Sequence, residues 1–166
     1  MNIILDYNQI EYKNIYFNEP IENTIINNGY FIKLIYSNND IILNGIYLDL
    51  KLKIKSKDFF YKKIRFNFNY DDNANLINNL IKIEKNILST YNSTKKHKLV
   101  VEKIFRENFI KVYPLFNNNS NNIIGELTQE KLRELDHSRF NNLVFKISGL
   151  WETSSEVGLT FKILIF

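Results

Sequence analysis

The chain has 166 residues, a formal net charge of +4 and 45% hydrophobic residues. These values predict one folded domain over residues 1–166, and they exclude an intrinsically disordered chain, which lacks the apolar residues that offset the entropy of ordering. The chain has no cysteine, which excludes disulfides and thiolate metal sites and favours a reducing, cytoplasmic location.

The N-terminal segment MNIILDYNQIEYK has a short apolar run interrupted by Asp6 and no basic start. We therefore expect neither a signal peptide nor a membrane anchor. No later segment approaches the roughly 18 uninterrupted apolar residues of a membrane span. The chain is also rich in Asn, Ile and Lys, whose codons are rich in A and T. This bias indicates an AT-rich genome, such as that of a large DNA virus, a parasite or a cytoplasmic genetic element.

Positive charge is concentrated in the middle of the chain. Residues 33–65 include eight basic and three acidic residues, and residues 95–111 include six basic and two acidic ones. Such a surplus favours a polyanionic partner. The alternative is that the lysines only keep a β-rich surface soluble.

Three strands are predicted in the first half of the chain. The segment YFIKLIY (30–36) is apolar and β-branched, and the turn signal SNND follows it. In residues 41–55, Leu and Ile alternate with Asp and Lys, which predicts a core face and a cationic face, and Gly45 predicts a bend. Residues 62–70 alternate in the same way. We expect these three strands to form an antiparallel meander.

The apolar period then changes to that of a helix. Apolar residues recur at helical spacing from Leu76 to Tyr91, after the capping candidates Asp71, Asp72 and Asn73. Residues 99–116 are expected to be strand, with helix as an alternative for their first half. Residues 117–122 are expected to be a loop, and a short helix is expected after Thr128.

The last predicted elements are two strands, residues 141–151 and 158–166. The chain is therefore expected to be mainly β, with one principal helix between the third and fourth strands. This order matches an OB-fold-like five-stranded Greek-key barrel with extra strands, a fold that binds oligonucleotides or oligosaccharides. A β-sandwich with one helix has a similar order and remains the alternative.

The sequence carries no recognisable enzyme motif. His97 and His137 lie far apart, and neither has a second ligand at metal spacing. No nucleophile elbow, P-loop or dinucleotide-binding glycine motif is present. Asp71 and Asp72 fit a helix start better than a two-metal site. We therefore expect a protein that is not an enzyme and has no metal or cofactor.

Binding of a single nucleic-acid strand needs a cationic groove for the phosphates and exposed rings on which bases stack. Alternation along residues 41–55 predicts that Tyr47 shares a strand face with Asp49 and Lys51. In the preceding strand, Lys33 shares a face with Phe31. The candidate phosphate ligands are Lys33, Lys51, Lys53, Lys55, Arg65, Lys96, Lys146 and Lys162. The candidate stacking residues are Tyr47, Trp151 and Phe161.

The stretch SGLWETSSEVGLTFK (148–162) holds the only tryptophan and two of the five glycines. It predicts a β-hairpin in which strict alternation places Lys146, Ser148 and Leu150 on one face and Ile147, Gly149 and Trp151 on the other. Gly149 is expected to allow a kink or the close approach of another segment, and Gly158 a positive φ. Trp151 is expected at a loop mouth, either stacking on a ligand or plugging the end of the barrel.

This hairpin resembles the C-terminal hairpin of OB-fold single-stranded DNA-binding proteins, such as those of DNA viruses and of virus-like linear plasmids in yeast cytoplasm. Bacterial members of that family end in an acidic tail that recruits partners, whereas this chain ends in FKILIF. The last strand is therefore expected to be paired or to contact another subunit. The residues that carry the resemblance are Lys146, Ser148, Gly149, Trp151, Glu152, Gly158, Leu159, Thr160, Phe161 and Lys162.

The resemblance implies a protein that coats and protects single-stranded DNA during replication with little sequence preference. Replication proteins and further copies of the chain are its expected protein partners. Two other functions fit the same residues: a structural or scaffolding β-protein of a virus or plasmid system, and an RNA-binding factor.

Overall fold

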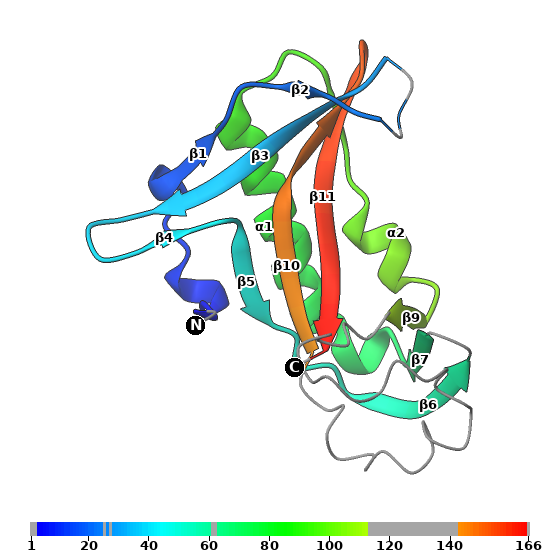
Figure 1. The fold of residues 1–166 in the computed structure, drawn as a ribbon. Helices are drawn as coiled ribbons and strands as arrows, with labels where there is room; N and C mark the ends of the chain where they lie inside the picture. The colour runs from blue at the N-terminus through cyan, green and yellow to red at the C-terminus, as the bar shows by residue number, and fades with distance from the viewer. Residues whose placement is uncertain (1–2, 25, 27, 61–62, 113–142, 166) are drawn as a thin grey trace, which may run out of the picture.

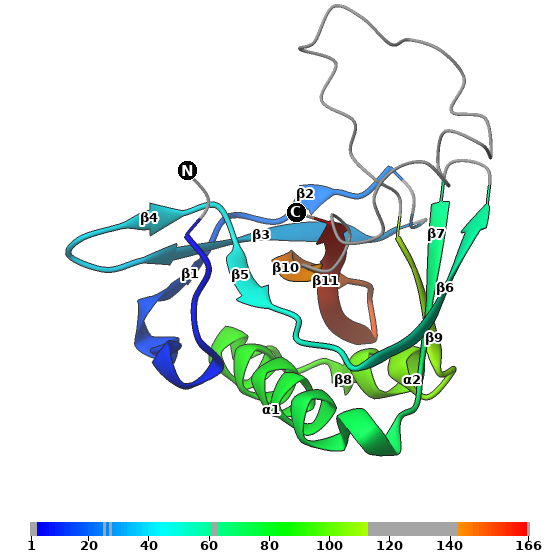
Figure 2. The ribbon, with the colours of Figure 1, turned by 90° about the horizontal axis from the view of Figure 1, so that it is seen from below.

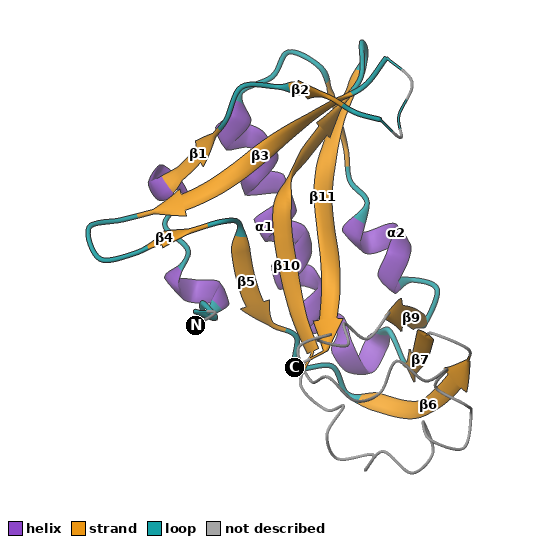
Figure 3. Cartoon of the chain, in the orientation of Figure 1, coloured by secondary structure: helices purple, strands orange, loops and turns teal. Residues whose placement is uncertain are grey.

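The computed structural model describes residues 3–24, 26, 28–60, 63–112 and 143–165. These residues form a curled main sheet, a smaller three-stranded sheet and one long helix (Figure 1). The structure therefore confirms a mainly β chain with a half-barrel sheet and one principal helix. Strands outnumber helices along the described chain, as colouring by secondary structure makes visible (Figure 3).

The main sheet has eight strands and is built around the C-terminal hairpin. Four strands of its central path run β1, β3, β10 and β11, and β8 joins β11 in parallel at the edge. Strands β2 and β4 pair with β3, whereas β5 pairs with β10. The strands are β1 (Ile15–Phe17), β2 (Ile21–Glu22), β3 (Tyr30–Ser37), β4 (Ile42–Leu43), β5 (Ile46–Asp49), β8 (Lys96–Lys98), β10 (Leu143–Glu152) and β11 (Glu156–Ile165).

The smaller sheet consists of β6 (Ile54–Phe60), β7 (Lys63–Phe68) and β9 (Phe109–Val112) in antiparallel order. Buried and partly exposed residues alternate along its central strand β7, and the buried ones are Ile64, Phe66 and Phe68. The strand expected over residues 62–70 is thus confirmed. Figure 2 shows this sheet at one end of the main sheet, with both helices on the same side of the main sheet.

The principal helix α1 (Ala74–Tyr91) confirms the helix predicted from the apolar spacing. Its apolar stripe is buried against the inner face of the main sheet, and Asn92 ends it with a left-handed φ of 53°. Asn73 precedes the helix but makes no capping bond. Its side chain instead accepts from the Lys53 N–H and donates to the carbonyls of Lys53 and Asn69. Asn73 thereby fixes the connection between β5 and β6 at the start of the helix.

Residues 99–112 form a short helix and then a strand. Helix α2 (Val101–Phe105) buries Val101 and Phe105, and β9 follows it. The start of α2 depends on Glu84 of α1, whose side chain is fully buried. Its carboxylate accepts hydrogen bonds from the backbone N–H groups of Val100 and Val101, at 2.8 and 3.2 Å. Burial raises the pKa of Glu84, and these two bonds oppose that rise.

The run from residue 41 to residue 55 is not the single strand that its alternation predicts. Its first part pairs with β3 as β4, and its second part pairs with β10 as β5. Its last residues begin β6 in the other sheet. The predicted bend at Gly45 is confirmed: φ is +100°, and a Cβ there would lie 2.3 Å from the carbonyl oxygen of Ile147. The expected three-stranded meander is therefore wrong, because the bend carries the chain from β3 to β10.

Three short 3₁₀ turns complete the described elements: η1 (Tyr7–Gln9), η2 (Tyr12–Asn14) and η3 (Asp71–Asn73). The predicted closing strands are confirmed as β10 and β11. The loop expected over residues 117–122 and the helix expected after Thr128 lie outside the described residues.

Neither α1 nor α2, the two α-helices in the described part of the chain, is both long and apolar enough to cross a membrane.

Replacing Glu84 by Ala is expected to destabilise the fold by about 1 to 3 kcal/mol, because the two backbone donors at the start of α2 lose their acceptor. Urea unfolding followed by far-UV circular dichroism measures this change. The matched control is Lys85→Ala, at the next, exposed position of the same helix. Equal midpoints for the two variants would contradict the structural role of Glu84.

Candidate nucleic-acid interface

The face of the main sheet opposite α1, here called the outer face, carries five of the eleven side chains that the sequence singled out, and Lys96 lies at its margin. It faces the viewer in Figure 1, with α1 behind the strands. Three neighbouring strands, β3, β10 and β11, form its centre, and β5 continues it beside β10. Residues in register across these strands form three transverse rows.

The first row joins Tyr47, Lys146 and Lys162. Tyr47 of β5 pairs with Lys146 of β10, which pairs in turn with Lys162 of β11. The Nζ atom of Lys146 lies 4.9 Å from the centroid of the Tyr47 ring, within the range of a cation–π contact. Two ammonium groups and one phenol ring therefore lie side by side on this face.

The second row joins Lys33, Gly149 and Thr160. Gly149 lets β3 and β10 approach closely, because a Cβ at this position would lie 2.1 Å from the carbonyl oxygen of Ile32. The close approach predicted for Gly149 is confirmed. Lys33 is thereby held beside β10, about two residue pairs from the row that contains Trp151.

The third row joins Phe31, Trp151 and Gly158. A Cβ on Gly158 would lie 2.4 to 2.7 Å from three atoms of the Trp151 indole, so the missing side chain makes room for the ring. The positive φ expected at Gly158 is wrong, since Gly45 is the glycine with positive φ among the described residues. Trp151 is half-buried on the sheet, one residue before the end of β10.

Strict alternation along β10 would place Trp151 on the face opposite Lys146. The register between β10 and β11 shifts between Ile147 and Gly149, which leaves Ser148 as an extra residue. After the bulge Leu150 points inward and is fully buried, and Trp151 joins the face of Lys146. The expected opposition of Lys146 and Trp151 is therefore wrong, and the bulge is its cause.

A hollow of about 490 Å³ lies beside Trp151 on this face. Ile21 of β2 pairs with Phe31 and continues the third row, and 60% of its surface is exposed. Thr160 brings a hydroxyl group to the hollow from β11. The complete lining is Ile21, Glu22, Asn23, Thr24, Ile26, Phe31, Trp151 and Thr160.

The charge balance of the outer face is positive. Asp49 pairs with Lys51 at 3.6 Å, and Glu156 pairs with Lys98 at 3.0 Å. Within the described part of the chain, no carboxylate lies within 4.0 Å of the ammonium groups of Lys33, Lys146 or Lys162. These three lysines are therefore available to an anionic ligand.

Lys96 lies at the margin of the same sheet, on the parallel edge strand β8. It is exposed and in register with Glu156 of β11. Lys98, two residues on, is in register with Gly158 and so continues the Trp151 row. Because Lys98 is paired with Glu156, Lys96 is the residue of this strand that adds positive charge at the edge of the sheet.

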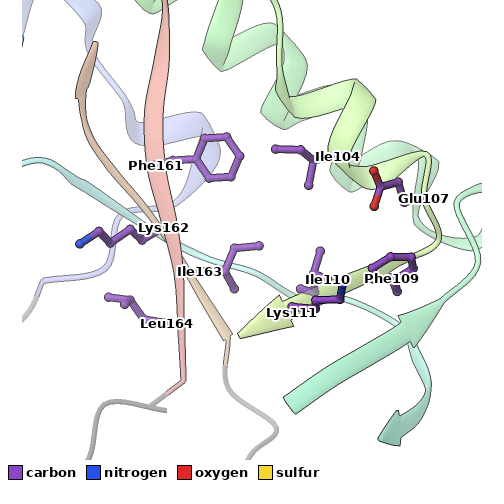
Figure 4. Close-up of a pocket in the computed structure, with 9 residues that line it drawn as sticks. All are labelled: Ile104, Glu107, Phe109, Ile110, Lys111, Phe161, Lys162, Ile163 and Leu164. Atoms are coloured by element: carbon purple, nitrogen blue, oxygen red, sulfur yellow. The ribbon is translucent and has the colours of Figure 1, made fainter. Parts of the chain in front are cut away.

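Phe161 does not lie on the outer face. It points inward from β11 and stacks on Phe145, with ring centroids 4.4 Å apart. Its ring lines an apolar groove of about 590 Å³ between β11 and the α2–β9 segment. In Figure 4 Phe161 and Ile163 point toward Ile104 and Ile110, whereas Lys162 points away from the groove.

Four other candidate cations lie away from the outer face, because the chain leaves the main sheet after Asp49. Lys51 and Lys53 are exposed next to the start of α1, where they line a small hollow. Lys55 is exposed on β6. Arg65 lies on β7, with its guanidinium carbon 3.9 Å from the centroid of the Phe109 ring. The expectation that Lys51, Lys53, Lys55 and Arg65 share a face with Tyr47 is therefore wrong.

The structure also adds residues that sequence reasoning did not select. One of them is Phe31, which the alternation over residues 30–36 had placed on the same face as Lys33. This shared face was the sequence signal from which Phe31 could have been selected. Ile21 and Thr160 carry no such signal, because only strand register brings them next to Trp151. In the described ranges, no three His, Asp or Glu side chains gather in a way that could hold a metal ion.

No protein-family model, curated protein or solved structure matches this chain. The interpretation of the outer face therefore rests on its geometry and chemistry.

Replacing Gly158 by Ala is expected to displace the Trp151 indole toward solvent, because the new methyl group occupies the space of the ring. Trp151 is the only tryptophan, so the emission maximum of the protein reports this movement directly, as a shift to longer wavelength. Ser148→Ala, on the strand that carries Trp151, is the control and should leave the emission unchanged. An unshifted spectrum for Gly158→Ala would contradict the described ring position.

Proposed function

We propose that this protein binds single-stranded DNA along the outer face of its main sheet, and that it coats and protects the strand during replication. The observation that carries this proposal is the row in which Tyr47, Lys146 and Lys162 lie in register, on the same face of the sheet as Trp151. Binding needs no bond-making step, and no residue of the outer face is assigned a catalytic role.

The physical basis of the proposal is the combination of charge and exposed rings. Lysines without carboxylate partners attract phosphates, and the counterions released on binding favour the complex. Half-buried rings offer surfaces on which bases stack, each stack contributing about 1 to 3 kcal/mol whatever the base. The pattern supports binding with little sequence preference, because phosphates and ring faces are common to all four nucleotides.

We also propose that the half-barrel is a divergent OB-fold. In support, the sheet is strongly curled, α1 lies in the sequence between β7 and the closing hairpin, and β10 and β11 form the centre of the sheet. The proposed binding face consists of strands rather than of long loops. In an OB-fold, too, oligonucleotides bind across one strand face and its neighbouring loops.

The double substitution Lys146→Ala with Lys162→Ala is expected to weaken binding to a fluorescent oligo-dT, measured by anisotropy over a range of salt concentrations. The affinity of the wild type should fall steeply with salt. The log–log slope of the double variant should be shallower by roughly 1.4, which is about 0.7 for each lost phosphate contact on a single strand.

The matched control is Lys82→Ala with Lys85→Ala, which removes the same charge from exposed positions of α1 on the other side of the sheet. This control should retain the wild-type slope. Equal slopes for the two double variants, or a wild-type affinity that does not change with salt concentration, would contradict the proposed interface. Competition by RNA as strong as that by DNA would instead favour an RNA-binding factor.

A further inference from the structure

We propose that the hollow beside Trp151 holds one unstacked base of the bound strand and thereby selects unpaired over paired DNA. This inference rests on the proposed function and deepens it. It concerns the part of the outer face where the third row, Phe31 and Trp151, continues into Ile21 of β2.

The shape and lining of the hollow favour a flat, mainly apolar group. Its volume of about 490 Å³ lies in the range of about 300 to 1,000 Å³ that is typical of small-molecule sites. Two aromatic rings and the exposed side chain of Ile21 provide its apolar lining. The indole of Trp151 occupies the space that a side chain at position 158 would fill. A nucleobase presents such a flat surface, and base–aromatic stacking is favourable for every base.

Polar groups around the hollow suit the edge of a base. Thr24 and Thr160 bring hydroxyl groups, which can donate or accept hydrogen bonds. Glu22 is in register with Tyr30, so its side chain leaves β2 on the side opposite Ile21. The phosphates are expected toward Lys33 and Lys146, which supply the positive charge on the face of the hollow.

The position of Lys33 agrees with this orientation. Lys33 and Phe31 are two residues apart on β3, so their side chains leave the same face about 7 Å apart along the strand. A base against Phe31 and Trp151 can thus have its own phosphate group near the ammonium group of Lys33. Charge and shape together indicate a nucleotide of a single strand as the occupant.

Selection for unpaired DNA follows because only a base with an exposed ring face can lie against Phe31 and Trp151. A base inside a duplex must lose its pairing and its stacking before it can enter such a hollow, and this loss costs a few kcal/mol. For a base in a single strand this free-energy cost is small, because the base has no pairing to lose. The phosphate contacts of the first row do not discriminate in this way, because a duplex also presents phosphates.

The test uses the full chain and two exposed isoleucines on the same sheet face. Ile21→Glu places a charge in the hollow, and Ile42→Glu places the same charge on β4, where Ile42 pairs with Ser37 and is 77% exposed. Each variant is titrated with oligo-dT and with an abasic oligonucleotide of the same length. Far-UV circular dichroism and sedimentation velocity check the fold and the oligomeric state.

We expect Ile21→Glu to weaken oligo-dT binding about tenfold and to leave abasic binding like that of Ile42→Glu, since only a base enters the hollow. Ile42→Glu should bind both oligonucleotides as the wild type does. Equal losses on both oligonucleotides, or no loss relative to Ile42→Glu, would overturn the base site while leaving the proposed function intact. A change of oligomeric state confined to Ile21→Glu would overturn it in favour of a protein contact.

The failure of the proposed function has a different signature. If the wild-type protein binds neither oligonucleotide at low salt, both proposals fall together. If the wild type binds oligo-dT and the abasic strand equally well, the phosphate contacts remain and the base site is excluded.

Discussion

The bulge at Ser148 in β10 is the constraint on which the outer face depends. β10 is paired on one side with β11 and on the other with β3 and β5, so its register sets which side chains meet across four strands. One extra residue between Ile147 and Gly149 turns Leu150 into the core and places Trp151 on the same face as Lys146. Without it the ring and the cations would lie on opposite faces. The combination of stacking surface and positive charge is thus a property of this register.

Two glycines let the neighbouring strands follow that register. Gly45, with its positive φ, bends the chain so that β5 reaches β10 and brings Tyr47 beside Lys146. Gly149 removes the side chain that would collide with the backbone of β3, which places Lys33 and Phe31 next to the hairpin. The apolar inner face is covered by α1, whose buried Glu84 also fixes the start of α2. The outer face is therefore positioned from both sides of the sheet.

The spacing of apolar and polar residues along the sequence predicted the individual helices and strands well. It failed where the structure depends on which strands pair with one another. The spacing of apolar residues was enough for α1, β7 and the closing hairpin, because each buries one regular face. It could not show that residues 41–55 divide among three partners, because alternation is the same whichever strand is paired. For the same reason Lys51, Lys53 and Lys55 were expected beside Tyr47, whereas the chain turns away after Asp49. The hollow at Ile21 forms only through the register of the paired strands, so no pattern in the sequence predicted it.

The most direct measurement of the central claim is lysine footprinting with and without saturating oligo-dT. Acetylation of each lysine is followed by mass spectrometry at low salt, which reports every lysine of the chain in one experiment. The account predicts strong protection of Lys33, Lys146 and Lys162 and unchanged labelling of Lys82 and Lys85 on α1. Protection confined to lysines away from the outer face, or equal labelling everywhere, would contradict it.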